Sequence, residues 1–245
     1  MGVDVEQSQV QFGKSAIPYV IHRSQRQKTV AVRVDPVEGV SVRAPRATPV
    51  ERLDQIVHGK SRWILDRRRR VEDLPPAPSP REFVSGETFL YLGRQYRLKL
   101  VRGRAARERG ARLGAGRILV PAAPPNGAAA AVRDHLGDWY RRRAEIRLPP
   151  RVAFWSERLG LHPTAILISD QKRRWGSVNK TQGLRLKWRV VQTSVRVVDY
   201  VIVHELTHLV HRHHDRNFWA ALGAAIGDYE SRREDLRRIG PGIVW

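Results

Sequence analysis

Short stretches of alternating apolar and polar residues open the chain and predict β-strands with one buried face. Three such stretches occur, at residues 19–23, 29–34 and 39–44. Thr48 and Glu51 then form a capping box, and the apolar spacing after them predicts one helix over about 48–70. The chain therefore begins with a strand-rich region that includes a single helix.

A second group of strand-like stretches follows a proline-rich linker at residues 75–80. These stretches lie at residues 88–92, 96–101 and 117–121. The Gly- and Arg-rich segment 102–116 predicts a mobile hairpin loop, and the segment 121–126 predicts a domain boundary. We therefore expect a β-rich N-terminal region over residues 1–122 and a second domain over residues 123–245.

Helices and one short sheet are predicted for the second domain. Asn126 is a candidate N-cap for a long helix, which Pro149 and Pro150 should break before a further helix ends near Gly160. Three strands follow, at residues 165–169, 174–178 and 184–191. The last strand alternates apolar residues with Arg185, Lys187 and Arg189, which predicts one buried and one solvated face. A helix from about 195 to 211 completes an α+β fold.

Composition narrows the possible chemistry. The chain has no cysteine, so a transition metal would have to be held by His, Asp or Glu. Its net charge of +21 attracts polyanions, and nucleic acid is a possible partner through this basic surface. No apolar run is long enough to span a bilayer and no secretory signal is visible, so we expect a cytoplasmic protein without a membrane partner.

The last predicted helix carries the sequence HELTH, from His204 to His208. Residues four apart lie on one helical face about 6 Å from each other, so His204 and His208 can bind one metal ion. Glu205 lies beside the first ligand and can reach a metal-bound water without binding the metal itself. This spacing predicts a metal site with a general base.

A third ligand is needed, and the candidates after the helix are His211, His213, His214 and Asp215. We favour His214, because the spacing HExxH-x5-H lets the chain leave the helix and return an imidazole to the metal. His211 and His213 would then lie around the site or in solvent. Glu230 on the next helix is an alternative third ligand.

Three imidazoles with an open fourth position are typical of catalytic zinc. Zinc would polarise a scissile carbonyl and lower the pKa of bound water, while Glu205 would move a proton from that water to the leaving amine. The predicted reaction is amide hydrolysis of a protein or peptide substrate. His211, His213 and Tyr229 are candidates for stabilising the oxyanion.

Several ordered motifs resemble the YgjP-like metallopeptidase family over roughly residues 20–235. They lie at 173–177 (RRWGS), 184–189 (LRLKWR), 198–208 (VDYVIVHELTH) and 214–219 (HDRNFW), with shorter matches at 23–28, 43–45, 63–64, 86–87 and 91–94. The resemblance implies His204, His208 and His214 as ligands and Glu205 as general base. The HExxH-x5-H helix behind a predicted three-stranded sheet favours a zincin-like minimal domain. Val178 and Thr207 stand where the family often has cysteine.

The C-terminal motif is also similar to the WLM and SprT-like peptidases, in which this pattern accompanies cleavage of proteins crosslinked to DNA. Phe218 and Trp219 match that ending, and we expect them to pack behind the site. Trp175 could be a core residue or could lie at the edge of the cleft, where a substrate adds as a strand. Two alternative functions therefore remain open: a DNA-associated protease, and a nucleic-acid-binding module with a non-catalytic metal.

Overall fold

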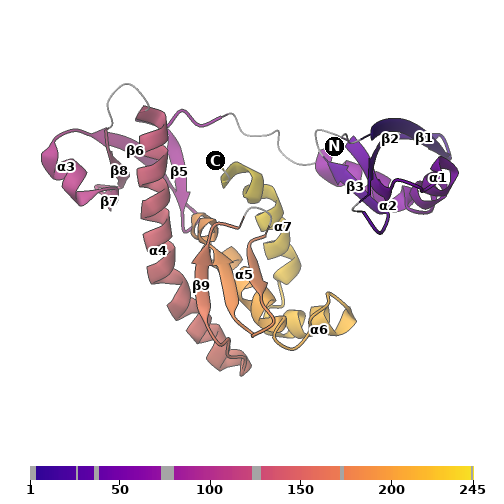
Figure 1. Cartoon of the computed structure of the whole chain (residues 1–245). Coiled ribbons are helices and arrows are strands. Elements are labelled where there is room, and N and C mark those ends of the chain that lie inside the picture. Colours follow the sequence, from indigo (N-terminus) through magenta and orange to yellow (C-terminus); the bar gives the residue numbers. More distant parts are fainter. Residues whose placement is uncertain are drawn as a thin grey trace. The chain divides into compact units, whose positions relative to one another are not determined.

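Two compact units make up the chain, Met1–Pro76 and Ala77–Trp245, in a computed structural model (Figure 1). The structure describes residues 4–25, 27–35, 39–72, 80–122, 128–171, 174–243 and 245. The predicted N-cap Asn126 and most of the predicted linker lie outside these residues. The units divide well before the predicted boundary between residues 122 and 123, because the strands that precede that boundary share the core of the C-terminal unit.

The N-terminal unit contains one four-stranded sheet and two helices. Its elements are β1 (Asp4–Phe12), β2 (Ser15–Ser24), β3 (Ala31–Asp35), β4 (Gly39–Pro45), α1 (Val50–Gly59) and α2 (Ser61–Glu72). The strand order is β1-β2-β4-β3, with β2 and β4 parallel and the outer pairs antiparallel. The helix predicted over 48–70 is therefore two helices, interrupted at Lys60, and β1 is a strand that the sequence pattern did not reveal.

Alternation along β2 and β4 produces the core of this unit. Ile17, Tyr19 and Ile21 share one face of the sheet and pack with Leu53 and Val57 of α1. The Tyr19 hydroxyl reaches beyond the apolar contact and donates a 2.7 Å hydrogen bond to Asp54 Oδ1. The polar end of a buried tyrosine is thereby satisfied, which burial of a phenol requires.

The C-terminal unit begins with a second four-stranded sheet. Its elements are β5 (Thr88–Tyr91), β6 (Arg94–Val101), α3 (Arg104–Arg109), β7 (Arg112–Gly114) and β8 (Arg117–Pro121). The order β5-β6-β8-β7, with β6 and β8 parallel, repeats the topology of the N-terminal sheet. The prediction of a mobile loop over residues 102–116 is wrong. Helix α3 and strand β7 occupy most of this segment, and Ala106 and Ala111 are buried.

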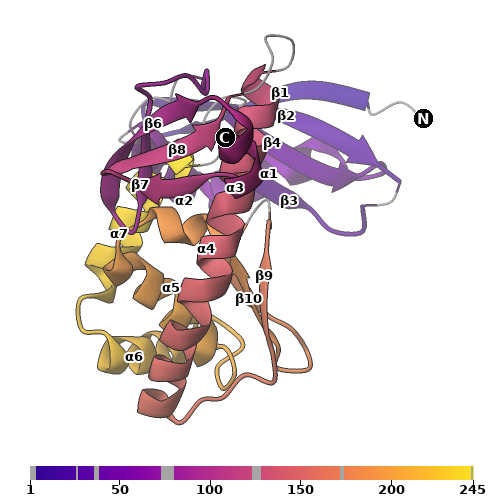
Figure 2. The ribbon, with the colours of Figure 1, turned by 90° about the vertical axis from the view of Figure 1, so that its left-hand side faces the viewer.

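One long helix, α4 (Ala128–Leu159), continues through Pro149 and Pro150. The predicted break at these prolines is wrong, because apolar residues on the buried face continue on both sides of them. Leu148 and Val152 are each 1% exposed, so tertiary packing holds the two parts in one helix despite the lost backbone hydrogen bonds. The helix contacts β8 of the second four-stranded sheet, and it also contacts β9 of a three-stranded sheet and helix α5, which are described next (Figure 2).

A three-stranded sheet of order β10-β11-β9 follows. It consists of β9 (Ile166–Ser169), β10 (Gly176–Val178) and β11 (Leu184–Lys187), and the 3-10 helix η1 (Trp188–Gln192) continues from β11. The strand predicted to reach residue 191 therefore ends early. The prediction that Lys187 and Arg189 lie on a solvated face is also wrong. They are only 3% and 9% exposed, because aromatic rings cover their side chains.

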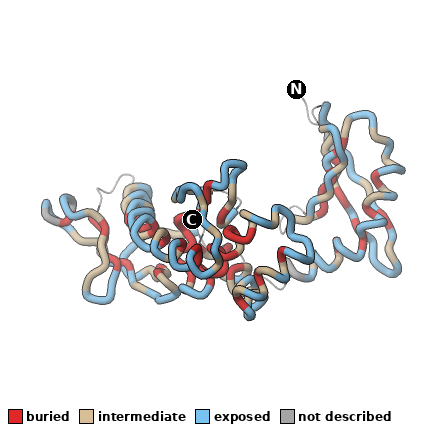
Figure 3. Tube along the Cα trace, turned by 90° about the horizontal axis from the view of Figure 1, so that it is seen from below, coloured by how far each residue is buried: buried red, intermediate tan, exposed pale blue. Residues whose placement is uncertain are grey.

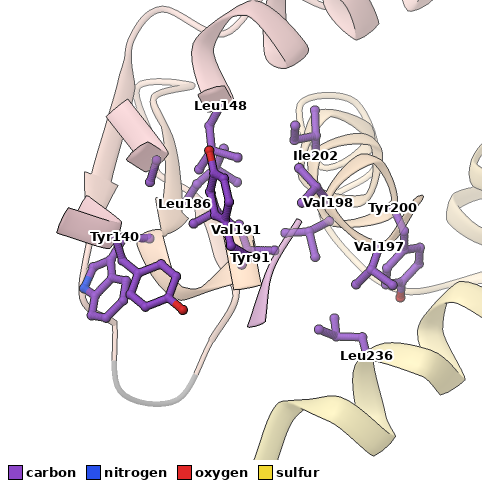
Figure 4. Close-up of a cluster of buried hydrophobic side chains, with 14 of the residues drawn as sticks. Tyr91, Tyr140, Leu148, Leu186, Val191, Val197, Val198, Tyr200, Ile202 and Leu236 are labelled. Carbon is purple, nitrogen blue, oxygen red and sulfur yellow. The ribbon is translucent and has the colours of Figure 1, made fainter. Parts of the chain in front are cut away.

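The remaining helices are α5 (Val195–Thr207), α6 (Arg216–Ala225), α7 (Tyr229–Ile239) and the 3-10 helix η2 (Gly240–Ile243). Helix α5 is buried on nearly every side: Val198 and Ile202 face Leu186 and Leu148, while Tyr200 faces Leu236 of α7 (Figure 4). Buried positions occur inside both units (Figure 3). Among the described residues, no helix combines the length and apolarity needed to cross a bilayer.

Candidate metal centre and catalytic cleft

Three histidines from two neighbouring segments converge at the carboxyl end of α5. His204 lies in the helix, His208 is its C-cap, and His214 comes from the loop before α6. One ligand atom from each lies within 4.8 Å of the other two. The Nε2 atoms of His204 and His214 are 3.0 Å apart. The spacing HExxH-x5-H therefore brings together the three imidazoles that the sequence singled out.

Local hydrogen bonds fix both ends of helix α5. Ser194 caps its beginning by accepting a hydrogen bond from the amide of Val197. Its last turn is tightened by bonds from the amides of His208 and Leu209 to carbonyls three residues earlier. The helix predicted to reach residue 211 therefore ends at Thr207, and the chain turns back toward the site sooner.

Helix α6 holds His214 in place. Its N-cap Asp215 accepts a 2.9 Å hydrogen bond from the amide of Phe218, and this bond lowers the pKa of the Asp215 carboxyl. Trp219 Nε1 donates a 3.1 Å hydrogen bond to the carbonyl oxygen of His214, and the two rings stack with centroids 5.5 Å apart. The direction of the His214 ring thus depends on the first turn of α6.

Phe218 forms an apolar floor beneath the histidines. It is fully buried, and its ring centroid lies 4.9, 4.6 and 4.7 Å from those of His204, His208 and His214. The expectation that Phe218 and Trp219 pack behind the site is confirmed by these contacts. Such packing fixes the imidazoles from below and keeps water away from that side.

His208 is oriented by the main chain. Its Nδ1 lies 2.9 Å from the carbonyl oxygen of His211, which can only accept a hydrogen bond, so the contact selects the tautomer in which Nδ1 carries the proton and Nε2 is the nitrogen that can bind a metal. His211 was expected near the site as a side chain, but the hydrogen bond that it makes to the triad comes from its backbone carbonyl. His213 is exposed and lies outside the group of three.

Glu205 is the buried acid of the cleft, 6% exposed. Burial raises the pKa of its carboxyl to about 8, and the guanidinium of Arg174 opposes this rise. The side chain lies against the backbone of Gly176 at the start of β10, where a Cβ would stand 2.5 Å from Glu205 Cγ. Only glycine leaves room for the carboxylate in this position.

An open cleft of about 630 Å³ runs past the histidines and Glu205. Trp175 lines it and is also packed from behind, since a Cβ on Gly240 would lie 3.1 Å from its ring and Lys187 Nζ lies 5.0 Å from the ring centroid. Both expected roles of Trp175, in the core and at the cleft edge, are therefore compatible with its position.

Tyr200 also lines the cleft, one turn before His204, and was not among the site residues predicted from the sequence. Its ring is 5% exposed and lies 5.7 Å from the His204 ring, and burial raises the pKa of its hydroxyl to about 12. Tyr229, which was considered as a site residue, does not line this cleft but stacks on Trp219 at 5.6 Å. Tyr200 could have been found from the sequence, because it lies four residues before His204 and therefore on the same helical face.

Glu230, the alternative third ligand, is outside the histidine cluster. It is exposed on the first turn of α7 and accepts a 3.4 Å hydrogen bond from the Tyr229 hydroxyl. Both residues line a different surface hollow, beside α6. The fold therefore brings His214, and not Glu230, to the pair on α5.

The three imidazoles suit a divalent transition metal. Burial and the neighbouring His208, His214 and Arg233 lower the pKa of His204 to about 3, so its imidazole is neutral and has a lone pair to offer. The 3.0 Å between the nitrogens of His204 and His214 is close to the ~3.3 Å expected for two nitrogens bound tetrahedrally to zinc. His204 Nδ1 is buried without a hydrogen-bond partner among the described residues.

Comparison with known proteins identifies a family whose sequence model matches most of the chain. The sequence model of the YgjP-like family, described as its metallopeptidase domain, matches residues 28–239. No curated protein matches the chain significantly. Two solved structures align at a TM-score of 0.34, which is too low to support an argument. They are the metallopeptidase zymogen abylysin of Pyrococcus abyssi (22% identity, covering 38% of this chain and 90% of that one) and the zymogen jannalysin of Methanocaldococcus jannaschii (24%, 40% and 97%).

Proposed function

The chain belongs to the YgjP-like metallopeptidase family, and on this premise we propose that it is a zinc-dependent peptidase with His204, His208 and His214 as ligands and Glu205 as general base. The observation that carries the proposal is the cluster of three imidazoles within 4.8 Å beside a buried carboxyl group. Neutral imidazoles favour zinc over calcium or magnesium, which prefer oxygen ligands.

The fold around this site supports a zincin-like arrangement. Helix α5 carries the HExxH motif and packs against β10 and β11 of the three-stranded sheet. The chain then turns back through the loop that contains His214 and enters α6. We propose that Ala77–Trp245 as a whole forms the peptidase unit, with β5–β8 supporting the helix.

The support comes from the β5–β6 turn. Gly93 in this turn has φ +78, and a Cβ there would lie 2.9 Å from Ser194 Cα, the N-cap of α5. The amide of Leu92 also donates a 2.7 Å hydrogen bond to the carbonyl of Val191. The second sheet thereby fixes the start of the helix that bears the metal ligands.

The proposed reaction is hydrolysis of a peptide bond. When bound, zinc supplies Lewis-acid polarisation of the scissile carbonyl and lowers the pKa of water toward about 7. Glu205 accepts the proton of the attacking water and passes it to the departing amine, which requires it to be ionised before the attack. The positive charge of the cation and of Arg174 favours that ionised form against the effect of burial.

Other residues of the chain keep these groups in position. The carbonyl of His211 orients His208, Trp219 holds the backbone of His214, and Phe218 packs beneath all three rings. Gly176 leaves the space in which the Glu205 carboxylate lies. Together they hold the ligands and the base without requiring a large rearrangement on binding.

The proposal is tested by metal analysis combined with a peptidase assay. Protein purified without added metal should contain about one zinc per chain. His204→Ala should lose that zinc, and Glu205→Gln should retain it but lose hydrolysis of an unfolded protein substrate. Equal zinc in the wild type and in His204→Ala, or undiminished hydrolysis by Glu205→Gln, would refute this assignment.

A DNA-bound protein is a second candidate substrate, because a net charge of +21 favours association with DNA. This candidate predicts that proteolysis is stimulated by double-stranded DNA and that the stimulation falls steeply with salt. Proteolysis that is indifferent to DNA at low ionic strength would eliminate it.

A further inference from the structure

Three cationic side chains line the cleft around the proposed site. Arg174 precedes β10, Lys180 lies in the turn between β10 and β11, and Arg212 lies in the loop between α5 and α6. All three are exposed, and they come from separate segments that the fold brings to one opening. Among the described residues that line the cleft, Glu205 alone is acidic, and the proposed mechanism already uses it.

These three charges have no ion-pair partner within 4.0 Å among the described residues, unlike many arginines elsewhere on the protein. Arginines with such partners are Arg23, Arg33, Arg81, Arg104, Arg133, Arg141, Arg151, Arg189, Arg196, Arg232, Arg237 and Arg238. A cation without an internal partner interacts more strongly with a charged ligand, because it has no carboxylate to give up on binding. The cleft therefore presents three positive charges that no direct ion pair occupies, although Arg174 also acts at longer range on Glu205.

We infer that this cleft selects polypeptide segments with acidic side chains near the scissile bond, which Arg174, Lys180 and Arg212 would bind. The inference rests on the proposed peptidase function and names its substrate class. A polypeptide, and not a nucleic acid, is the expected occupant because the same opening contains the proposed catalytic base and histidines. Its walls also include apolar side chains, among them Val178 and Leu209, which suit a peptide.

The expected preference is moderate and depends on salt. A solvent-exposed ion pair contributes about 0.2–1 kcal/mol, so each well-placed acidic residue should raise kcat/KM by up to about 5-fold at low ionic strength. Screening at high salt should reduce the preference, because the three side chains are exposed. A basic segment should be disfavoured by comparable like-charge repulsion.

The test uses three peptides that differ only in the residues flanking one cleavable bond, which are Glu, Gln or Lys. Their kcat/KM values are measured with the zinc-loaded full chain at low and high ionic strength. Their dissociation constants are measured in parallel with the zinc-loaded Glu205→Gln protein by fluorescence anisotropy. Binding therefore gives a result that does not depend on hydrolysis.

The Glu peptide should bind tightest and be cleaved fastest, and high salt should reduce both advantages. Replacing Arg174, Lys180 and Arg212 together with Gln should abolish the preference. Arg147→Gln is the matched control, since Arg147 is exposed on α4, has no ion-pair partner among the described residues and is not in the cleft. It should retain the preference.

Equal binding and cleavage of the three peptides would overturn the inference while leaving the peptidase proposal intact. Absence of cleavage together with preferred binding of the Glu peptide would refute the peptidase proposal and keep the charge selectivity. Displacement of the Glu peptide by a short single-stranded oligonucleotide that binds more tightly, through the same three side chains, would assign them to nucleic acid and overturn the inference.

Discussion

The side chain of Glu205 lies directly on the backbone of Gly176, so closely that a Cβ at position 176 would stand 2.7 Å from the carboxylate oxygen Oε1. The two residues belong to different elements, α5 and β10, which pack against each other. The proposed general base can therefore take this position only because residue 176 on the strand is a glycine and has no side chain.

Gly176→Ala should impair catalysis without removing the metal. The new methyl group must push the Glu205 carboxylate aside, and we expect kcat to fall by about 10- to 100-fold, because small misplacements of a catalytic group have effects of this size. Zinc content should stay near the wild-type value. Gly227→Ala is the control, since nothing lies within 4 Å of a Cβ there. Unchanged kcat in Gly176→Ala would contradict this role.

His214→Ala should weaken zinc binding by more than about 100-fold, a larger loss than altered surrounding residues usually cause. Competition with a chromogenic chelator measures the affinity. His213→Ala and Glu230→Gln should bind zinc like the wild type, because neither side chain belongs to the histidine cluster. His211→Ala should also retain zinc, since the backbone carbonyl that orients His208 is kept. Normal affinity in His214→Ala would reject it as third ligand.

Trp219→Phe should reduce zinc affinity without unfolding the protein. The substitution removes the hydrogen bond to the His214 carbonyl and part of the ring stacking, so we expect a loss of about 10-fold. Isothermal calorimetry measures the change, and circular dichroism checks the fold. Trp63→Phe, at a position 47% exposed in the N-terminal unit, should leave the affinity unaltered. An equal loss in both variants would remove the specific role of Trp219.

The fragment 77–245 should fold and bind zinc, whereas the fragment 123–245 should not fold. The shorter fragment lacks β5–β8, whose buried Phe89, Leu98 and Ile118 share a core with α4. It also lacks the Gly93 turn that contacts the N-cap of α5. Cooperative urea unfolding and zinc stoichiometry measure the outcome. Folding of 123–245 would restore the boundary predicted from the sequence.

Tyr19 should make stability depend on pH above pH 10. Burial, and then the hydrogen bond to Asp54, raises its pKa to about 12, whereas an unfolded tyrosine titrates near 10. The folded state therefore holds the proton that the unfolded state has released, so this stabilisation is complete below about pH 10 and is lost as pH rises toward 12.

Urea denaturation followed by circular dichroism across this range measures the dependence. Tyr19→Phe should be less stable by about 1 kcal/mol at neutral pH, since the hydrogen bond is lost, and its stability should fall less steeply above pH 10. The same slope in both proteins would show that Tyr19 does not contribute.

The histidines and the base could be predicted because their relationship is local. His204, Glu205 and His208 lie within two turns of one helix, and the loop to His214 is short. Gly176 could not be linked to Glu205 in this way, because the contact joins segments that only the packing of β10 against α5 brings together.

The misjudged strand shows a second limit of sequence patterns. Alternation correctly predicts that Arg185 is exposed, but Lys187 and Arg189 follow the same pattern and are buried. Their charges lie over the rings of Trp175, Trp188 and Trp245, and Trp245 is more than fifty positions away in the sequence. A period of two reveals which residues share a face, but not what the rest of the chain lays over that face.

The early end of α5 at Thr207 has an electrostatic consequence. The peptide dipoles of a helix add to a partial negative charge at its carboxyl end, and His208 caps α5 there. A cation bound by the three histidines would lie near this negative pole, gaining about 0.3–1 kcal/mol where the site is exposed. A helix that continued to residue 211 would carry that pole a full turn beyond the ligands and weaken this attraction.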